Sequence, residues 1–206
     1  MVKRAIEIQR KYANRPRRKL IVLGVEGKQN KTEMLYFDEL AKRTKNCTFV
    51  YANSKNDPLG IVNSVIDKAK REEIEQDDLA IAMFDVDNDE SKRKQIVMAE
   101  NKAKESEYNI KVLTSNPCFE IWYLEHFGFT TKPFKDGKDV EKELLKHINN
   151  YEKSRCPIEV IYLKTKQAIT NVEKLREFNM LNSTEKNEHY YNPSTNVDIL
   201  VKEIIQ

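Results

Sequence analysis

Short apolar runs alternate with amphipathic segments along the first 115 residues of the chain. Four of these runs are rich in aliphatic and β-branched residues, and they lie at positions 19–25, 47–52, 79–84 and 110–114. Continuous apolar runs of this length are typical of strands that are covered on both faces of a sheet. Between them, apolar residues recur three and four positions apart, as Val62, Val65 and Ala69 do. That spacing predicts helices that each turn one face toward a core.

Residues that favour helix starts stand where this pattern requires them. Thr32 opens one amphipathic segment, and Asp57 followed by Pro58 opens the next. A third, highly charged segment runs from about Glu90 to Glu105. Strand and helix therefore alternate in the order of a parallel sheet with right-handed crossovers. The sequence predicts an α/β fold, with a Rossmann-like sheet of about four mostly parallel strands flanked by helices.

The alternation stops after residue 115, and the helical spacing of apolar residues continues toward the end of the chain. Asn116 and Pro117 are typical of a helix start, and Asn192 or Ser194 would cap the last helix. We expect three parts: a basic N-terminal arm (1–18), an α/β core (19–115) and an α-helical C-terminal extension packed on that core (116–206).

The net charge of +3 conceals an uneven distribution. The first nineteen residues carry eight Lys or Arg against one Glu, so the rest of the chain sums to −4. Such an arm contacts phosphates or an acidic partner, or it only solubilises the terminus, and the sequence leaves both readings open.

Other features limit the class of protein. No apolar run is long enough to cross a bilayer and the start has no secretory pattern, so we expect a cytoplasmic protein without membrane contact. The cysteines, Cys47, Cys118 and Cys156, lie far apart and form no CxxC pair. Neither a disulfide framework nor a zinc site is therefore indicated.

Acidic residues follow the first and third apolar runs. Glu26 follows the first, and Asp85 and Asp87 follow the third in the stretch LAIAMFDVDNDE. The carboxyl ends of parallel strands meet at one edge of a sheet, so these carboxylates would converge if the two strands are neighbours. In extended backbone Asp85 and Asp87 would point to the same side and repel each other unless a cation neutralised them. Oxygen-only sites suit Mg²⁺ or Mn²⁺, although each acid taken singly fits a solvated turn or a helix cap.

Other acidic or glycine-containing motifs fit less well. An EF-hand loop needs glycine where Glu90 stands and a bidentate glutamate where Ile96 stands, so it is excluded. The stretch GVEGKQNKTE contains neither a P-loop nor a GxGxxG pattern. A haloacid-dehalogenase-type phosphatase also has an aspartate pair at a strand end. It stays an alternative, although its pattern has Thr or Val where Asp89 stands and its nucleophile follows the first strand.

A glutamate and glycine after the first strand, with DxD after a later one, resemble the signature of the Toprim domain, which occurs in topoisomerases, primases and small nucleases. The stretches LIVLGVEGKQNKTEMLYFDEL, FDVDND, SNPCFEIWYLEHF and NPSTNVDILV, taken in order, resemble the RloB-like family from about residue 19 onward. The resemblance implies a Toprim-like core and phosphodiester chemistry that depends on a divalent metal. It also implies a bacterial defence setting, with restriction–modification genes or a partner ATPase.

The resemblance assigns roles to individual positions. Glu26 matches the Toprim glutamate, and Asp85 and Asp87 match the DxD pair. These residues would hold one or two Mg²⁺ or Mn²⁺ ions, with Glu26 as a ligand or as general acid/base. Asp89 is an outer metal ligand or only a helix cap, and Glu120 is a further candidate for the site.

Phosphate binding has three candidates. Lys28 and Lys31 follow the first strand and would steer a phosphate, unless they are simply solvated. Asn116, interpreted as a helix start, would offer free backbone N–H groups to a phosphate.

The leading hypothesis is a metal-dependent Toprim-type nuclease, the effector of a phage-defence system of the abortive-infection or restriction-associated kind, which cleaves DNA or an RNA such as tRNA. Two alternatives stay open: a non-catalytic adaptor subunit that binds the ATPase of a defence operon, and a metal-dependent phosphatase. The sequence does not choose an oligomeric state.

Overall fold

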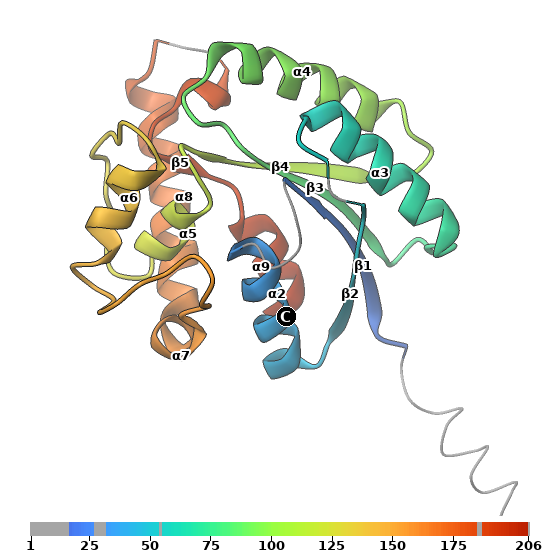
Figure 1. Ribbon diagram of the computed structural model, residues 1–206, viewed down its shortest axis with the longest axis horizontal. Helices are drawn as coiled ribbons and strands as arrows, with labels where there is room; N and C mark the ends of the chain where they lie inside the picture. Colours follow the sequence, from blue (N-terminus) through green and yellow to red (C-terminus); the bar gives the residue numbers. More distant parts are fainter. Residues whose placement is uncertain (1–16, 27–31, 54, 185–186, 206) are drawn as a thin grey trace, which may run out of the picture.

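One sheet of four parallel strands and a short antiparallel strand organises the protein. The computed structural model describes residues 17–26, 32–53, 55–184 and 187–205. The strands are β1 (Lys19–Val25), β2 (Cys47–Tyr51), β3 (Leu79–Asp85), β4 (Ile110–Asn116) and β5 (Ser194–Thr195). They lie in the order β2-β1-β3-β4-β5, and only β5 runs antiparallel to its neighbour (Figure 1). The predicted α/β class is confirmed, with a fifth strand that the apolar pattern did not indicate.

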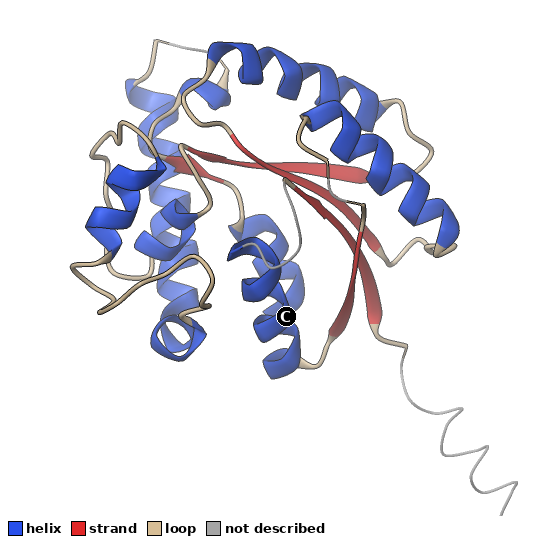
Figure 2. Ribbon diagram, viewed as in Figure 1, coloured by secondary structure: helices blue, strands red, loops and turns tan. Residues whose placement is uncertain are grey.

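Helices cover both faces of this sheet (Figure 2). α3 (Pro58–Arg71) and α4 (Glu90–Lys104) pack on one face, and α2 (Thr32–Thr44) and α9 (Asp198–Ile205) lie on the other. The C-terminal part adds α5 (Glu120–Leu124), α6 (Gly137–Leu144), α7 (Ile158–Ile161) and α8 (Thr165–Asn182), with the short 3₁₀ helices η1 (Tyr162–Lys164) and η2 (Glu188–Tyr190). None of the helices in the described ranges is long and apolar enough to span a membrane.

Successive strand residues feed two different hydrophobic clusters. Ile21 and Leu23 of β1 point into the larger cluster with α2 and the C-terminal helices. Val22, between them, joins the cluster under α3 and α4. β3 behaves in the same way, with Ile81 on one side and Ala82 on the other. Both faces of β1 and β3 are therefore apolar, which explains why these strands read as uninterrupted apolar runs.

The predicted core and C-terminal extension share the larger cluster. Tyr36 of α2 contacts Phe119, with ring centroids 5.8 Å apart, and Trp122, with centroids 6.3 Å apart. All three side chains are buried. Most of the predicted basic arm, residues 1–16, lies outside the described residues, and Arg17 forms an ion pair with Asp78 at 2.9 Å.

Two expected helix starts are wrong. Asn116 is the last residue of β4, where its backbone pairs with Ser194, and the next helix begins only at Glu120. Asn192 and Ser194 do not cap the final helix either, because Ser194 lies in β5 and α9 begins at Asp198. In both cases a strand pairing between distant segments prevails over a local helix signal.

Two other start signals are confirmed, whereas Thr32 is the first residue of α2 itself and its hydroxyl donates to Glu120 instead of capping the helix. Asp57 caps α3 by accepting the Gly60 N–H at 2.7 Å, with Pro58 as the first helical residue. Asp89 caps α4 by accepting the Lys92 N–H at 2.7 Å. All three cysteines are free thiols, as expected.

Gly24 allows α3 to approach β1 closely, and its replacement tests this packing. A Cβ atom at position 24 would lie 2.5 Å from Val65 Cγ2 and 2.9 Å from Ile61 Cγ2. We expect Gly24→Ala to lower the free energy of unfolding by about 1–3 kcal/mol, because the added methyl group overpacks this contact. Urea denaturation measures the change. Gly128→Ala is the control, since a Cβ there has no neighbour within 4 Å. Equal stability of the two variants would contradict the interpretation.

Candidate functional site

The three acids of the sequence motif lie at one edge of the sheet. Glu26 follows β1 and forms an isolated parallel bridge with Lys55. Asp85 is the last residue of β3, the strand directly beside β1. Asp87 follows two positions later. Because β1 and β3 are parallel neighbours, both strands deliver their acidic ends to the same place.

Lys92 joins two of these acids. Its Nζ lies 2.8 Å from Glu26 Oε2 and 2.5 Å from Asp87 Oδ2. The lysine side chain is 17% exposed, against 53% for Asp87. Burial lowers the pKa of Lys92, but the hydrogen bonds to Asp87 and Glu26 outweigh it and raise the pKa above its usual value. Lys92 therefore remains a cation between two carboxylates.

Sequence reasoning missed Lys92, although a local signal existed. The residue stands three positions after the helix cap Asp89. Side chains in the first turn of a helix point back toward its N-terminus, which brings this lysine beside the turn that carries Asp87. The contact with Glu26, 66 residues away, required knowledge of the strand order.

Asp85 lies among other carboxylates. It is half-buried, and its Oδ1 accepts the Phe119 backbone N–H at 2.9 Å. Desolvation raises the pKa of Asp85 well above its usual range, and the negative charges of Glu33, Glu120, Asp87 and Glu26 raise it further. A carboxyl group in this position favours a proton or a cation nearby.

The backbone separates Asp85 from Asp87. Asp87 and Asn88 have left-handed φ angles of 55° and 54°, so the expected extended DxD segment with both side chains on one side is wrong. Asp87 N–H donates to the Pro117 carbonyl at 3.0 Å. Asn88 Nδ2 donates to the carbonyl of Phe134 at 3.1 Å. The left-handed turn directs Asp87 toward Lys92 and leaves Asp85 deeper, near the other acids.

Glu120 forms the inner wall of the site. It is the first residue of α5 and is 2% exposed. Its Oε1 accepts hydrogen bonds from Thr32 Oγ1 at 3.2 Å and from Tyr151 OH at 3.1 Å. Lys153 Nζ lies 3.5 Å from the same oxygen. A polar network from three segments thus fixes this carboxylate near Asp85.

Glu33 is an acid that the sequence analysis did not assign. It is the second residue of α2 and is 8% exposed. Among the neighbouring charges that raise the pKa of Asp85, Glu33 has the largest effect. Its position at the end of the stretch GVEGKQNKTE was the available signal, because a helix that starts beyond β1 returns its first turn to the same sheet edge.

The remaining sequence candidates lie elsewhere or have structural roles. Asp89 caps α4, because its Oδ1 accepts the backbone N–H of Lys92. Asn116 is fully buried, and its Nδ2 donates to the Tyr191 carbonyl at 2.8 Å, so it is no helix N-terminus that could bind a phosphate. Lys28 and Lys31 lie outside the described residues.

An open hollow adjoins the outer acids. It has a volume of about 380 Å³, and its described lining consists of Glu26, Asn56, Pro58, Asp87, Asp89, Lys92 and Gln95. In the described part of the chain, no group of three acidic, His or Cys side chains already has metal-coordinating geometry. Lys92 lies between Glu26 and Asp87, the two carboxylates that would bind a metal ion in this hollow. The available ligands fit a hard divalent cation, because they are carboxylate oxygens, which such ions prefer. A nearby cation would also stabilise the charged form of Asp85, whose pKa is raised.

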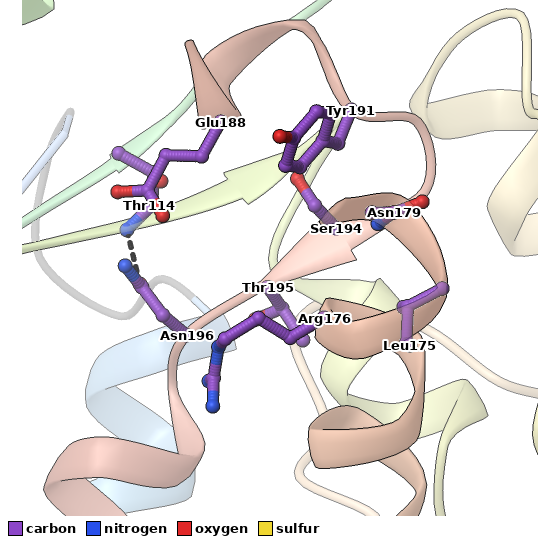
Figure 3. A pocket seen from close by; sticks show the side chains of 9 residues that line it. All are labelled: Thr114, Leu175, Arg176, Asn179, Glu188, Tyr191, Ser194, Thr195 and Asn196. Atoms are coloured by element: carbon purple, nitrogen blue, oxygen red, sulfur yellow. Dashed lines mark hydrogen bonds between the residues drawn. The ribbon is translucent and has the colours of Figure 1, made fainter. Parts of the chain in front are cut away.

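A second hollow lies between β5 and α8 (Figure 3). Its volume is about 20 Å³, which suits about one water molecule. Its polar groups bind each other or their neighbours: Thr114 N–H donates to Asn196 Oδ1 at 2.6 Å, and Arg176 pairs with Asp198 at 2.6 Å. The first contact joins the C-terminal part to β4 and the second joins α8 to α9, which leaves little for a ligand to bind.

Comparison with known proteins gives one match. The searches of curated proteins and of solved structures found no match. The family model described as RloB-like protein matches residues 21–204, which includes the acidic edge, the segment around α5 and the last strand and helix. Because this match spans nearly the whole chain, the protein belongs to the RloB-like family.

Proposed function

We propose that the protein is a Toprim-type nuclease that uses Mg²⁺ or Mn²⁺ to cleave phosphodiester bonds in DNA or RNA. One observation carries the proposal: Glu26, Asp85 and Asp87 meet at the carboxyl edge of two neighbouring parallel strands, where burial and the nearby acids raise the pKa of Asp85. Grouping like charges in a desolvated place costs stability, and such costs are typical of sites that bind a cation or catalyse a reaction.

Different residues would bind the metal, orient its ligands and transfer protons. Glu26, Asp85 and Asp87 would hold the metal, with Glu33 and Glu120 completing the negative charge around Asp85. A divalent metal held there would supply the positive charge that polarises a phosphate and stabilises its leaving oxygen. The Phe119 N–H orients the Asp85 carboxylate, and the network of Thr32, Tyr151 and Lys153 orients Glu120. Glu26, at the rim of the hollow, is the residue that either completes the metal site or transfers a proton to or from the reacting water.

Family membership suggests the biological setting. Membership of the RloB-like family is compatible with a defence-associated protein. We propose that the nuclease is the effector of such a system, cytoplasmic, and controlled by a partner ATPase. Exposed apolar side chains are candidate contacts for a partner: Leu163 of η1 is 92% exposed, and Met180 and Leu181 at the far end of α8 are 67% and 76% exposed. These residues also keep the adaptor alternative open.

Cleavage of nucleic acid by the purified protein tests the proposal. We expect cleavage of DNA or of total RNA in the presence of Mg²⁺ or Mn²⁺, and loss of at least about a hundredfold in rate for Asp87→Asn. Changes next to metal ligands already cost 10- to 100-fold. Asp67→Asn, an exposed aspartate of α3, is the control for the same chemical change.

The outcomes separate the alternatives. Equal cleavage by the wild type and Asp87→Asn would exclude a metal nuclease at this site. Hydrolysis of an aryl phosphate without nucleic-acid cleavage would favour the phosphatase. Toxicity in cells that survives Glu26→Ala but disappears with changes at Leu163 or Leu181 would favour the adaptor.

A further inference from the structure

Lys92 occupies the place that a metal ion would need. Its ammonium group contacts Glu26 Oε2 at 2.8 Å and Asp87 Oδ2 at 2.5 Å. We propose that Lys92 is a built-in counter-ion that a divalent cation displaces, and that its released ammonium group then binds the phosphate of the substrate. This inference rests on the proposed function.

Occupation by lysine and by metal is mutually exclusive on grounds of distance. Mg²⁺ binds carboxylate oxygens at about 2.0–2.1 Å. An ion that bridged the same two oxygens of Glu26 and Asp87 would therefore lie almost on the Nζ atom of Lys92, and the two positive charges would repel each other. Binding of the ion requires the lysine side chain to leave.

The Lys92 ammonium group has space into which it can move. The backbone of the lysine is fixed, because its N–H donates to the Asp89 cap at 2.7 Å. Its flexible four-carbon stem allows the ammonium group to move without the helix. The hollow of about 380 Å³ opens beside it, and Lys92 is the only cationic side chain in the described part of its lining. An anionic substrate in that hollow would meet three acids, Glu26, Asp87 and Asp89, and needs this positive charge.

Metal affinity tests the displacement directly. We expect Lys92→Met to bind Mn²⁺ at least about tenfold more tightly than the wild type, because the metal no longer competes with a contacting positive charge. Isothermal titration calorimetry and electron paramagnetic resonance of Mn²⁺ measure this without any substrate. Lys94→Met is the matched control: it lies on the same helix, is 75% exposed and pairs only with Glu90 among the described residues. Affinity of Lys92→Met equal to that of Lys94→Met would overturn the proposal.

Thermal unfolding gives an independent readout. In EDTA we expect Lys92→Met to melt below the wild type, since Glu26 and Asp87 lose their counter-ion. Addition of Mg²⁺ should raise the melting temperature of Lys92→Met more than that of the wild type. A lysine with only a structural role would lower the melting temperature by the same amount with and without Mg²⁺, which would also overturn the proposal.

Cleavage at saturating Mn²⁺ tests the second role of the lysine. Lys92→Met should bind metal tightly but cleave at least about tenfold more slowly, because loss of one oriented charge at a reacting phosphate costs this much or more. Lys92→Arg should restore part of the rate, and full activity of Lys92→Met would refute phosphate binding.

Failure of this inference is distinguishable from failure of the proposed function. If Glu26→Gln and Asp87→Asn weaken Mn²⁺ binding but Lys92→Met does not strengthen it, only the counter-ion role is wrong. If neither acid variant changes Mn²⁺ binding, the proposed metal site is wrong.

Discussion

Replacement of Asp85 by asparagine is expected to abolish cleavage and to stabilise the folded protein in metal-free buffer. Without metal, the Asp85 carboxyl is desolvated and faces Glu33, Glu120, Asp87 and Glu26, which raise its pKa. Removal of its charge relieves this repulsion, while the asparagine oxygen can still accept the Phe119 N–H. Opposite changes in activity and stability are characteristic of residues that are retained for function.

Two measurements test this expectation together. Thermal unfolding in EDTA at pH 8 should give a higher melting temperature for Asp85→Asn than for the wild type, and the nuclease assay should show loss of at least about a hundredfold. The gain should shrink as pH falls, because the wild-type carboxyl then takes up its proton. In excess Mg²⁺ the order of stability should reverse, since only the wild type gains from binding the ion. A variant that is inactive and also less stable at every pH would indicate a structural role.

Substitution of Glu125 by glutamine is expected to produce the largest change in stability. Glu125 is fully buried, and no side chain in the described residues donates a hydrogen bond to its carboxylate oxygens. Burial raises the pKa of Glu125 from 4.5 to about 8, and the Thr130 backbone offsets this only in part. The folded state therefore holds a proton that the unfolded state releases above about pH 4.5.

The sign of the pH dependence follows from this difference. A carboxyl whose pKa is raised by folding makes the protein less stable as pH increases from about 4.5 to about 8. The full penalty is on the order of 3–5 kcal/mol above pH 8, and Glu125→Gln should remove most of it there while changing little near pH 5. Urea denaturation between pH 5 and pH 9 measures the effect. Glu177→Gln, at an exposed position of α8, is the matched control, and a gain independent of pH would show that charge burial is not the cause.

The regular part of the fold follows closely from the apolar pattern. The runs 19–25 and 79–84 correspond to β1 (Lys19–Val25) and β3 (Leu79–Asp85), because the central residues of a strand buried on both faces are apolar at successive positions. β5 has no such signature. Ser194 and Thr195 are polar, and they form a strand only because they pair with Ser115 and Asn116 of β4, nearly eighty residues earlier. Context of this kind outweighs local propensity.

The outer acids of the candidate site could be predicted from topology, and the inner ones only in part. Glu26 and Asp85 end adjacent parallel strands, which is a property of the strand order. Glu120 was named from its motif, but Glu33 and Lys92 depend on which way the first turns of two helices face. Asn116 was misassigned because the following proline resembles a helix start, while the sheet continues through it to pair with β5.

The Asp87–Asn88 turn also limits how the protein can be divided. Asn192 Nδ2 donates to Asn88 Oδ1 at 3.1 Å and to the Phe134 carbonyl at 2.6 Å, so the C-terminal segment holds the turn that presents Asp87. The Rossmann-like half is therefore not a transferable module. A gene truncated before residue 192, or a chimera that grafts residues 19–115 onto another scaffold, would retain Glu26, Asp85 and Asp87 and lose the Asn192 contacts that hold the turn.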